Sequence, residues 1–256
     1  MNRFEQGCID AKFTQDMKLR RGYGEVYDIL FDILGTDISI LELGVGSGNS
    51  HIRWLHILSK DVIGIEIAGP NKQKCNPSLY TGDPNIVDRQ IEIALLAEEQ
   101  FRSLPKEQTD RLHVYLYTDA YSPETTKMIE QNHGKLKVIV NDAKHSPNCH
   151  NLFLSTWQDN ITADGLLVQE DIARWVNNNS EEYEEPKAKE LVRALETGWN
   201  IYQFVDYDLE NTGGSANQKA SLIGLHYTDS KWDSYLEPLK DRKVTLDNYL
   251  MYCSGE

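Results

Sequence analysis

The stretch "ISILELGVGSGNSHIRWLHIL", residues 38–58, decides the fold of this chain. A run rich in isoleucine and leucine enters a loop that contains Gly44, Gly46 and Gly48, and a helical pattern follows. A strand that ends in a glycine loop and continues as a helix is typical of sites for anionic or ribose-bearing ligands. Glycine has no side chain, so a ligand can approach the backbone closely, and the N-terminus of the helix favours negative charge. The stretch therefore predicts a nucleotide-like ligand at the end of the first strand.

The spacing of the three glycines excludes two common nucleotide motifs. Gly48 follows Gly46 by two residues, which gives E-x-G-x-G-x-G from Glu42. The dinucleotide fingerprint is G-x-G-x-x-G, so it does not match. A P-loop is also excluded, because no Lys-Ser or Lys-Thr pair follows the glycines.

Strand and helix patterns alternate along the chain from residue 39 onward. This alternation predicts an α/β fold with a doubly wound, mostly parallel sheet of seven strands. The last two strands, over 200–209 and 221–229, have no helical pattern between them, so we expect the last strand to be antiparallel. We predict one domain over 1–256, with an N-terminal helical cap over 1–36 and a ligand-binding core over 37–256.

The composition indicates which binding partners and which cellular compartment to expect for this protein. A formal net charge of −14, from 40 acidic and 26 basic residues, argues against a nucleic-acid partner, which needs clustered Lys and Arg. No apolar run approaches the roughly 20 residues that cross a bilayer. The segment "MNRFEQGCIDAKF" lacks the apolar core of a signal peptide. We therefore expect a cytoplasmic protein with no membrane partner.

Acidic residues lie at the ends of the second and third predicted strands. Glu66 ends the second strand, where a carboxylate can accept hydrogen bonds from both ribose hydroxyls. Asp119 follows the third strand and can accept from an adenine amine, with Ala120 and Tyr121 lining the ring. Together with the motif at Glu42, this order of strand ends resembles the class I S-adenosylmethionine-dependent methyltransferases over about 220 residues.

That resemblance implies S-adenosyl-L-methionine as the cofactor. The residues that it assigns to the cofactor lie at four strand ends and in the loop between the first strand and its helix. They are Glu42, Gly44, Gly46, Gly48, Ser50, Glu66, Asp119, Ala120, Tyr121 and Asp142.

A second group of polar residues follows the fourth and fifth strands. The fourth strand ends "VIVNDAKH" with Asp142 and His145, and the fifth ends "LVQEDI" with Glu170 and Asp171. Three carboxylates in one crevice repel one another unless they are protonated, paired or bridged by a cation. Oxygen ligands of this kind suit Mg²⁺, Mn²⁺ or Ca²⁺. The alternative is that the aspartate contacts only the cofactor or caps a helix, and that the histidine and the Glu-Asp pair face solvent.

The pattern N-D-A-x-H, followed one strand later by E-D, resembles the metal-dependent O-methyltransferases that modify sugars of macrolides and other glycosides, and the rhamnosyl O-methyltransferases. The resemblance implies that Asp142, Glu170 and Asp171 hold Mg²⁺, or Mn²⁺, and that His145 is the catalytic base. Asp142 then has a catalytic role as well. The segment "GYGEVYDILFDIL" is similar to the helix of this group whose tyrosines, here Tyr23 and Tyr27, approach the cofactor.

The expected function is therefore a divalent-metal-dependent O-methyltransferase that acts on a sugar hydroxyl, as in rhamnose or another deoxyhexose of a glycan or glycoside. The partner would be a sugar-bearing small molecule or glycan, and a homo-oligomer is compatible with the sequence. Two alternatives stay open. One is a catechol-type or other small-molecule O-methyltransferase, and the other is a non-methylating relative involved in the hydroxylation of antibiotic precursors.

Overall fold

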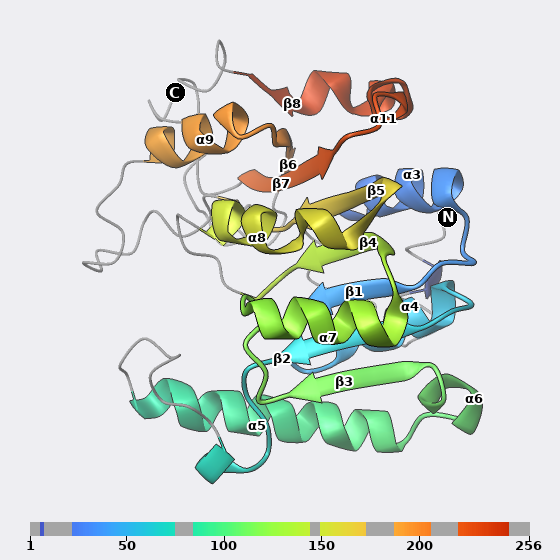
Figure 1. Cartoon of the computed structure of the whole chain (residues 1–256), viewed down its shortest axis with the longest axis vertical. Coiled ribbons are helices and arrows are strands. Elements are labelled where there is room, and N and C mark those ends of the chain that lie inside the picture. The colour runs from blue at the N-terminus through green and yellow to red at the C-terminus, as the bar shows by residue number, and fades with distance from the viewer. Residues whose placement is uncertain are drawn as a thin grey trace.

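The computed structural model describes residues 6–7, 22–74, 84–143, 149–172, 187–205 and 220–245 (Figure 1). Its centre is an eight-stranded sheet in the order β3-β2-β1-β4-β5-β7-β6-β8. The strands are β1 (Ile40–Leu43), β2 (Val62–Glu66), β3 (Leu112–Leu116), β4 (Leu136–Asn141), β5 (Ile161–Gln169), β6 (Asn200–Val205), β7 (Ala220–Tyr227) and β8 (Lys243–Val244).

The direction of the strands confirms the predicted fold class. Strands β1 to β5 pair in parallel, and β7 lies antiparallel between β5 and β6. The sequence analysis did not predict β8, which pairs with β6 through Ile201 and Val244. A strand of two residues is too short for a periodic signal, so its existence depends on the partner strand that the fold supplies.

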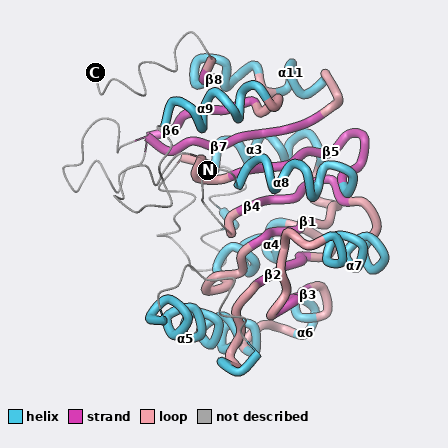
Figure 2. The backbone as a smooth tube through the Cα atoms, turned by 60° about the vertical axis from the view of Figure 1, so that its left-hand side comes forward, coloured by secondary structure: helices cyan, strands magenta, loops and turns pink. Residues whose placement is uncertain are grey.

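Helices cover both faces of the sheet. The α-helices are α3 (Gly24–Leu34), α4 (Asn49–Ile57), α5 (Pro84–Arg102), α6 (Lys106–Thr109), α7 (Pro123–His133), α8 (Cys149–Trp157), α9 (Lys187–Glu196) and α11 (Lys231–Tyr235). Short 3₁₀ turns are η1 (Lys72–Lys74), η3 (Gln158–Asn160) and η6 (Glu237–Arg242). In both views α5 lies at the β3 end of the sheet and α11 at the β8 end (Figures 1 and 2). No helix in these described ranges is both long and apolar enough to span a membrane.

Two apolar cores lie on opposite faces of the sheet. Ile40 packs with α3, α4 and α11, whereas its neighbour Leu41 packs with α7, α8 and α9. The same alternation holds for Val138 and Ile139 in β4. A strand that is buried on both faces needs consecutive apolar residues, which explains the unbroken apolar runs of the sequence.

Two helix ends are explained by the chemistry of residues close to them in the sequence. Gly35 ends α3 with a φ of 73°, and its N–H donates to the Phe31 carbonyl. The Ser122 side chain caps α7 by accepting from the Thr125 N–H, and Pro123 occupies the first turn. Helix α3 lies within the helical cap predicted over 1–36, of which residues 1–5 and 8–21 lie outside the described residues.

The parallel strands bring their carboxyl ends to one edge. Leu43 of β1 is in register with Ile65 of β2 and with Asn141 of β4, and Asn141 is in register with Gln169 of β5. Neighbouring strands are about 4.8 Å apart. The residues that follow these strands therefore lie side by side, although they are distant in sequence.

Candidate active site

The glycine loop after β1 packs closely against the end of β4. Gly44 has a φ of 92°, in the left-handed region that favours glycine. A Cβ at this position would lie 2.6 Å from the carbonyl oxygen of Asp142. Only glycine therefore fits between these two strand ends. Gly48, with a φ of 84°, is the N-cap residue of α4.

Gly46 differs from its two neighbours because its surroundings are open. Its φ is 53°, and a Cβ built on it would meet no atom of the described chain within 4 Å. A ligand can approach the backbone at this point. The contact of Gly46 with the cofactor stays a prediction.

Glu66 anchors the glycine loop to the end of β2. Its Oε2 accepts from the N–H groups of Val45, at 3.0 Å, and Gly46, at 3.2 Å. Its Oε1 accepts from the N–H of Ala68 at 3.0 Å. The carboxylate predicted to bind ribose thus lies beside the predicted cofactor loop and also shapes it. Its contact with ribose stays a prediction.

Glu42 and Ser50 occupy different surroundings. The Glu42 carboxylate lies in the core, and its Oε2 accepts from Trp54 Nε1 at 2.6 Å. This bond holds α4 against β1, a role that the sequence analysis did not predict. Ser50 lies partly buried in the first turn of α4.

The predicted adenine-binding residues form a turn after β3. Asp119 Oδ1 accepts from the N–H of Tyr121 at 2.9 Å. Ala120 is buried, and its carbonyl accepts from Trp157 Nε1 at 2.9 Å. The Tyr121 hydroxyl donates to Asn141 Oδ1 at 2.9 Å, so this turn is tied to the end of β4.

A buried amide pair joins the ends of β4 and β5. Asn141 Nδ2 donates to Gln169 Oε1 at 2.8 Å, and Gln169 Nε2 donates to the carbonyl of Glu170 at 2.8 Å. This pair was not predicted from the sequence. A signal was present, since both residues are polar and each directly follows an apolar run, VIV in β4 and LLV in β5.

The carboxylates after β4 and β5 lie at the same edge as the glycine loop. Asp142 is partly buried, and its N–H donates to the Leu43 carbonyl at 3.0 Å. Glu170 is fully buried and Asp171 is 3% exposed. The three predicted metal ligands therefore follow two adjacent strands beside the loop.

Two tyrosines from the N-terminal part of the sequence contact these carboxylates: Tyr27 in α3, and Tyr23, the N-cap residue of α3. The Tyr27 hydroxyl donates to Glu170 Oε1. The Tyr23 hydroxyl lies 3.0 Å from Asp171 Oδ1 and 3.1 Å from the carbonyl of Leu222. Each tyrosine thus contacts a carboxylate that was assigned to the metal, and the predicted approach of both tyrosines to the cofactor stays a prediction.

Burial raises the pKa of Tyr27 well above its ordinary value, and the negative charges of Glu170, Glu42 and Asp142 raise it further. The phenol therefore keeps its proton and acts as a hydrogen-bond donor to Glu170.

The backbone at Asp171 is strained. Its φ is 57°, in the left-handed region that residues other than glycine rarely adopt. Such a conformation costs about 1–3 kcal/mol and is concentrated at functional sites. The strain therefore supports a functional role for this residue. His145, the predicted base, lies outside the described residues.

The architecture matches solved methyltransferase structures. TomG, an O-methyltransferase from Streptomyces achromogenes involved in tomaymycin synthesis and solved with S-adenosylmethionine, matches with a TM-score of 0.52 and 11% identity over 88% of each chain. The MycE methyltransferase of the mycinamycin pathway, solved with Mg, S-adenosylhomocysteine and mycinamycin VI, matches with a TM-score of 0.51 and 14% identity. That match covers 89% of this chain and 56% of MycE, so the chain spans little more than half of MycE.

The chain has the class I methyltransferase fold. The strand order and the antiparallel β7 agree with the structural matches. No protein-family model and no curated protein sequence matches the chain, so the likeness is one of fold.

Proposed function

We propose that this protein is an S-adenosylmethionine-dependent O-methyltransferase. The observation that carries the proposal is the open backbone at Gly46 beside the Glu66 carboxylate, at the carboxyl edge of the sheet. Ligands of open α/β sheets bind at this edge. Structures of this fold that contain S-adenosylmethionine or S-adenosylhomocysteine support the same choice of cofactor.

We also propose that Asp142, Glu170 and Asp171 hold a divalent cation, Mg²⁺ or Mn²⁺. Their carboxylate oxygens are suitable ligands for a hard dication. Because Glu170 and Asp171 are buried, their negative charges are costly unless a positive charge compensates them. When bound, such an ion lowers the pKa of a coordinated hydroxyl. The presence of Mg in the MycE complex supports the proposal by analogy of fold.

Tyr27 of α3 and its N-cap residue Tyr23 would position this site. Tyr27 and Tyr23 donate to Glu170 and Asp171, and hydrogen bonds of this kind fix the orientation of ligand carboxylates. They are positioning residues, because they act through the carboxylates.

The proposed acceptor is a sugar hydroxyl of a glycoside or glycan, as in a deoxyhexose such as rhamnose. A sugar hydroxyl is a weak acid, so its methylation benefits from a general base, and His145 is the proposed base. A catechol ionises more readily and has less need of that base.

A methyl-transfer assay tests the proposal. The protein is incubated with S-adenosylmethionine and a panel of glycosides and catechols, and mass spectrometry detects acceptors that gain one methyl group. We expect methylated glycosides, loss of turnover with EDTA, and recovery with Mg²⁺ or Mn²⁺. Methylated catechols alone would contradict the sugar acceptor, and full turnover after exhaustive chelation would contradict the metal. No product from any acceptor would contradict the methyltransferase activity.

A further inference from the structure

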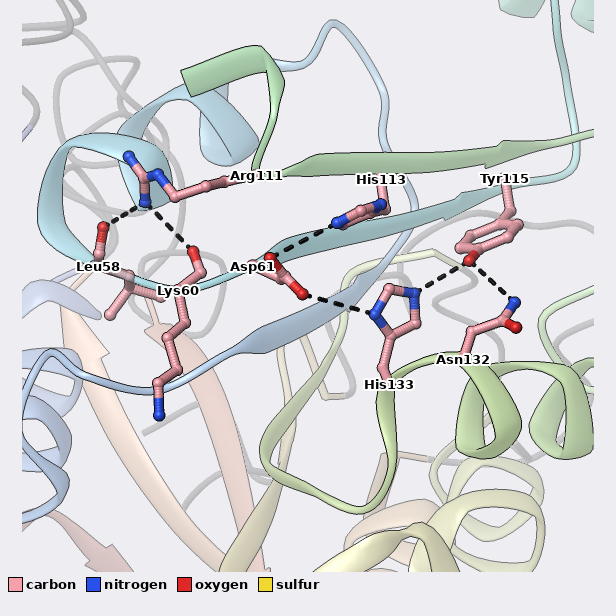
Figure 3. A network of polar contacts seen from close by, with 8 residues as sticks. All are labelled: Leu58, Lys60, Asp61, Arg111, His113, Tyr115, Asn132 and His133. Carbon is pink, nitrogen blue, oxygen red and sulfur yellow. Dashed lines mark hydrogen bonds and ion pairs between the residues drawn. The ribbon is translucent and has the colours of Figure 1, made fainter. Parts of the chain in front are cut away.

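Two histidines and an aspartate meet at the amino edge of the sheet (Figure 3). The glycine loop lies at the opposite edge, because it follows the carboxyl end of β1. Asp61 precedes β2, His113 lies in β3, and His133 is the last residue of α7. One ligand atom from each lies within 4.8 Å of the other two. Three segments that are distant in sequence thus bring three metal-binding side chains together.

The distances within this Asp61–His113–His133 cluster fit ligands around an ion better than hydrogen bonds. His113 Nε2 lies 3.5 Å from Asp61 Oδ1, and His133 Nδ1 lies 3.7 Å from Asp61 Oδ2. Good N–H···O hydrogen bonds measure about 2.7–3.2 Å. Ligand atoms about 2.0–2.2 Å from a tetrahedral ion are about 3.3–3.5 Å apart. The two observed separations, which end on different oxygens of Asp61, lie at or slightly above that range.

A second layer of hydrogen bonds orients His133. Its Nε2 lies 3.0 Å from the Tyr115 hydroxyl, which accepts from Asn132 Nδ2 at 3.3 Å (Figure 3). Nδ1 is thereby directed towards Asp61. Metal-binding histidines commonly have their second ring nitrogen fixed by such a hydrogen bond.

The loop before Asp61 is also fixed. The Arg111 guanidinium donates through Nη1 to the carbonyls of Leu58, at 2.6 Å, and Lys60, at 3.2 Å (Figure 3). The aspartate is therefore held by the backbone on which it lies. A preorganised ligand loses less conformational entropy on binding an ion.

The cluster is closed on one side and open on the other. The His133 side chain is 6% exposed, whereas the side chains of His113 and Asp61 are 37% and 40% exposed. Burial lowers the pKa of His133, which favours the neutral imidazole that binds metals. An ion can enter from the open side, and water can complete its coordination.

We propose that Asp61, His113 and His133 form a binding site for a divalent transition metal, and specifically Zn²⁺. Two imidazoles and one carboxylate match zinc, whereas Mg²⁺ and Ca²⁺ prefer oxygen ligands. The bound ion would join the start of β2, β3 and the end of α7.

This site is separate from the proposed active site. Asp61 and Glu66 lie at opposite ends of β2, which at about 3.3 Å per residue places them roughly 16 Å apart. The zinc site therefore does not depend on the proposed methyl transfer, and either can fail alone.

Calorimetric titration of chelator-treated protein with ZnCl₂, together with thermal unfolding, tests the proposal. We expect the wild type to bind one Zn²⁺ per chain that folded His113→Asn does not bind, and to have a higher melting temperature with Zn²⁺. Tyr115→Phe should weaken binding about 10–100-fold by removing the hydrogen bond to His133. His113→Asn should abolish binding. It replaces a partly exposed side chain, so the fold should survive.

His56→Asn is the matched control, because His56 is an exposed histidine of α4 outside the cluster. Its zinc affinity should equal that of the wild type. No stoichiometric binding by the wild-type protein would overturn the proposal. So would unchanged affinity in folded His113→Asn, or equal losses in His56→Asn and His113→Asn.

Discussion

The hydroxyl of Tyr27 donates to the buried carboxylate of Glu170, which lies 143 residues later in the chain. The bond joins α3 to the end of β5. An N-terminal helix thus supplies a hydrogen bond inside the site that the carboxyl ends of the strands define. The hydrogen bond explains why a tyrosine of this helix lies beside the buried carboxylates, a relation that sequence spacing alone does not show.

Tyr27→Phe should lower the free energy of unfolding by about 1–3 kcal/mol, because a buried carboxylate loses its donor while the ring is kept. Urea unfolding measures the change. Tyr235→Phe is the control, since Tyr235 is 40% exposed and should change stability by less than about 0.5 kcal/mol. Equal stability of the two variants would show that the Tyr27 hydroxyl contributes nothing.

Glu66→Ala should weaken the binding of S-adenosylhomocysteine by about 1.5–3 kcal/mol, the range for hydrogen bonds to a charged group. The glycine loop would also lose the acceptor of the Val45 and Gly46 N–H groups. Calorimetric titration measures the affinity. Glu98→Ala, which removes an exposed carboxylate paired with Arg102, should bind like the wild type. The assignment of Glu66 is wrong if its variant binds with unchanged affinity.

Asp171→Asn should raise the Mg²⁺ concentration needed for half-maximal methyl transfer. The change removes a charge but keeps the oxygen that accepts from Tyr23. Asparagine also tolerates the observed φ of 57° better than most residues. Asp164→Asn, which removes the carboxylate paired with Lys137, is the control and should leave the metal requirement unchanged. The same metal requirement in both variants would remove Asp171 from the proposed ligand set.

His226 should make stability depend on pH. Burial lowers its pKa, so the unfolded chain binds more protons once the pH falls below the ordinary value of about 6.5. This contribution to stability is present above that pH and is lost as the pH falls through the lowered pKa. His226→Gln should therefore lose less stability than the wild type between neutral and mildly acidic pH. Urea unfolding across that range measures it, and parallel curves would contradict the effect.

The order of helices and strands could be predicted from the sequence because the residues that begin and end each element are close to it in the chain. The glycine at residue 35 and the serine at residue 122 end and begin helices by chemistry that neighbouring residues determine. The strand ends at Glu66, Asp142 and Glu170 follow from parallel alternation, which brings the carboxyl ends to one edge.

The contacts between distant segments could not be predicted in the same way. Trp54 binds Glu42, and His133 lies beside Asp61, only because the sheet places their segments together. Each residue is unremarkable in its own sequence context. The direction of a buried side chain depends on which helix packs over it, and local periodicity does not contain that information.

The central proposal is that the glycine loop binds the cofactor. Calorimetric titration with S-adenosylhomocysteine tests this proposal most directly. We expect the wild type to bind one ligand per chain. Gly46→Val should bind at least about tenfold more weakly, a loss of about 1.4 kcal/mol, because its side chain fills the space open to the ligand. Gly134→Ala also replaces a glycine of positive φ, at the end of α7, and should keep the wild-type affinity. Absence of binding by the wild type, or full affinity in a folded Gly46→Val protein, would contradict the assignment.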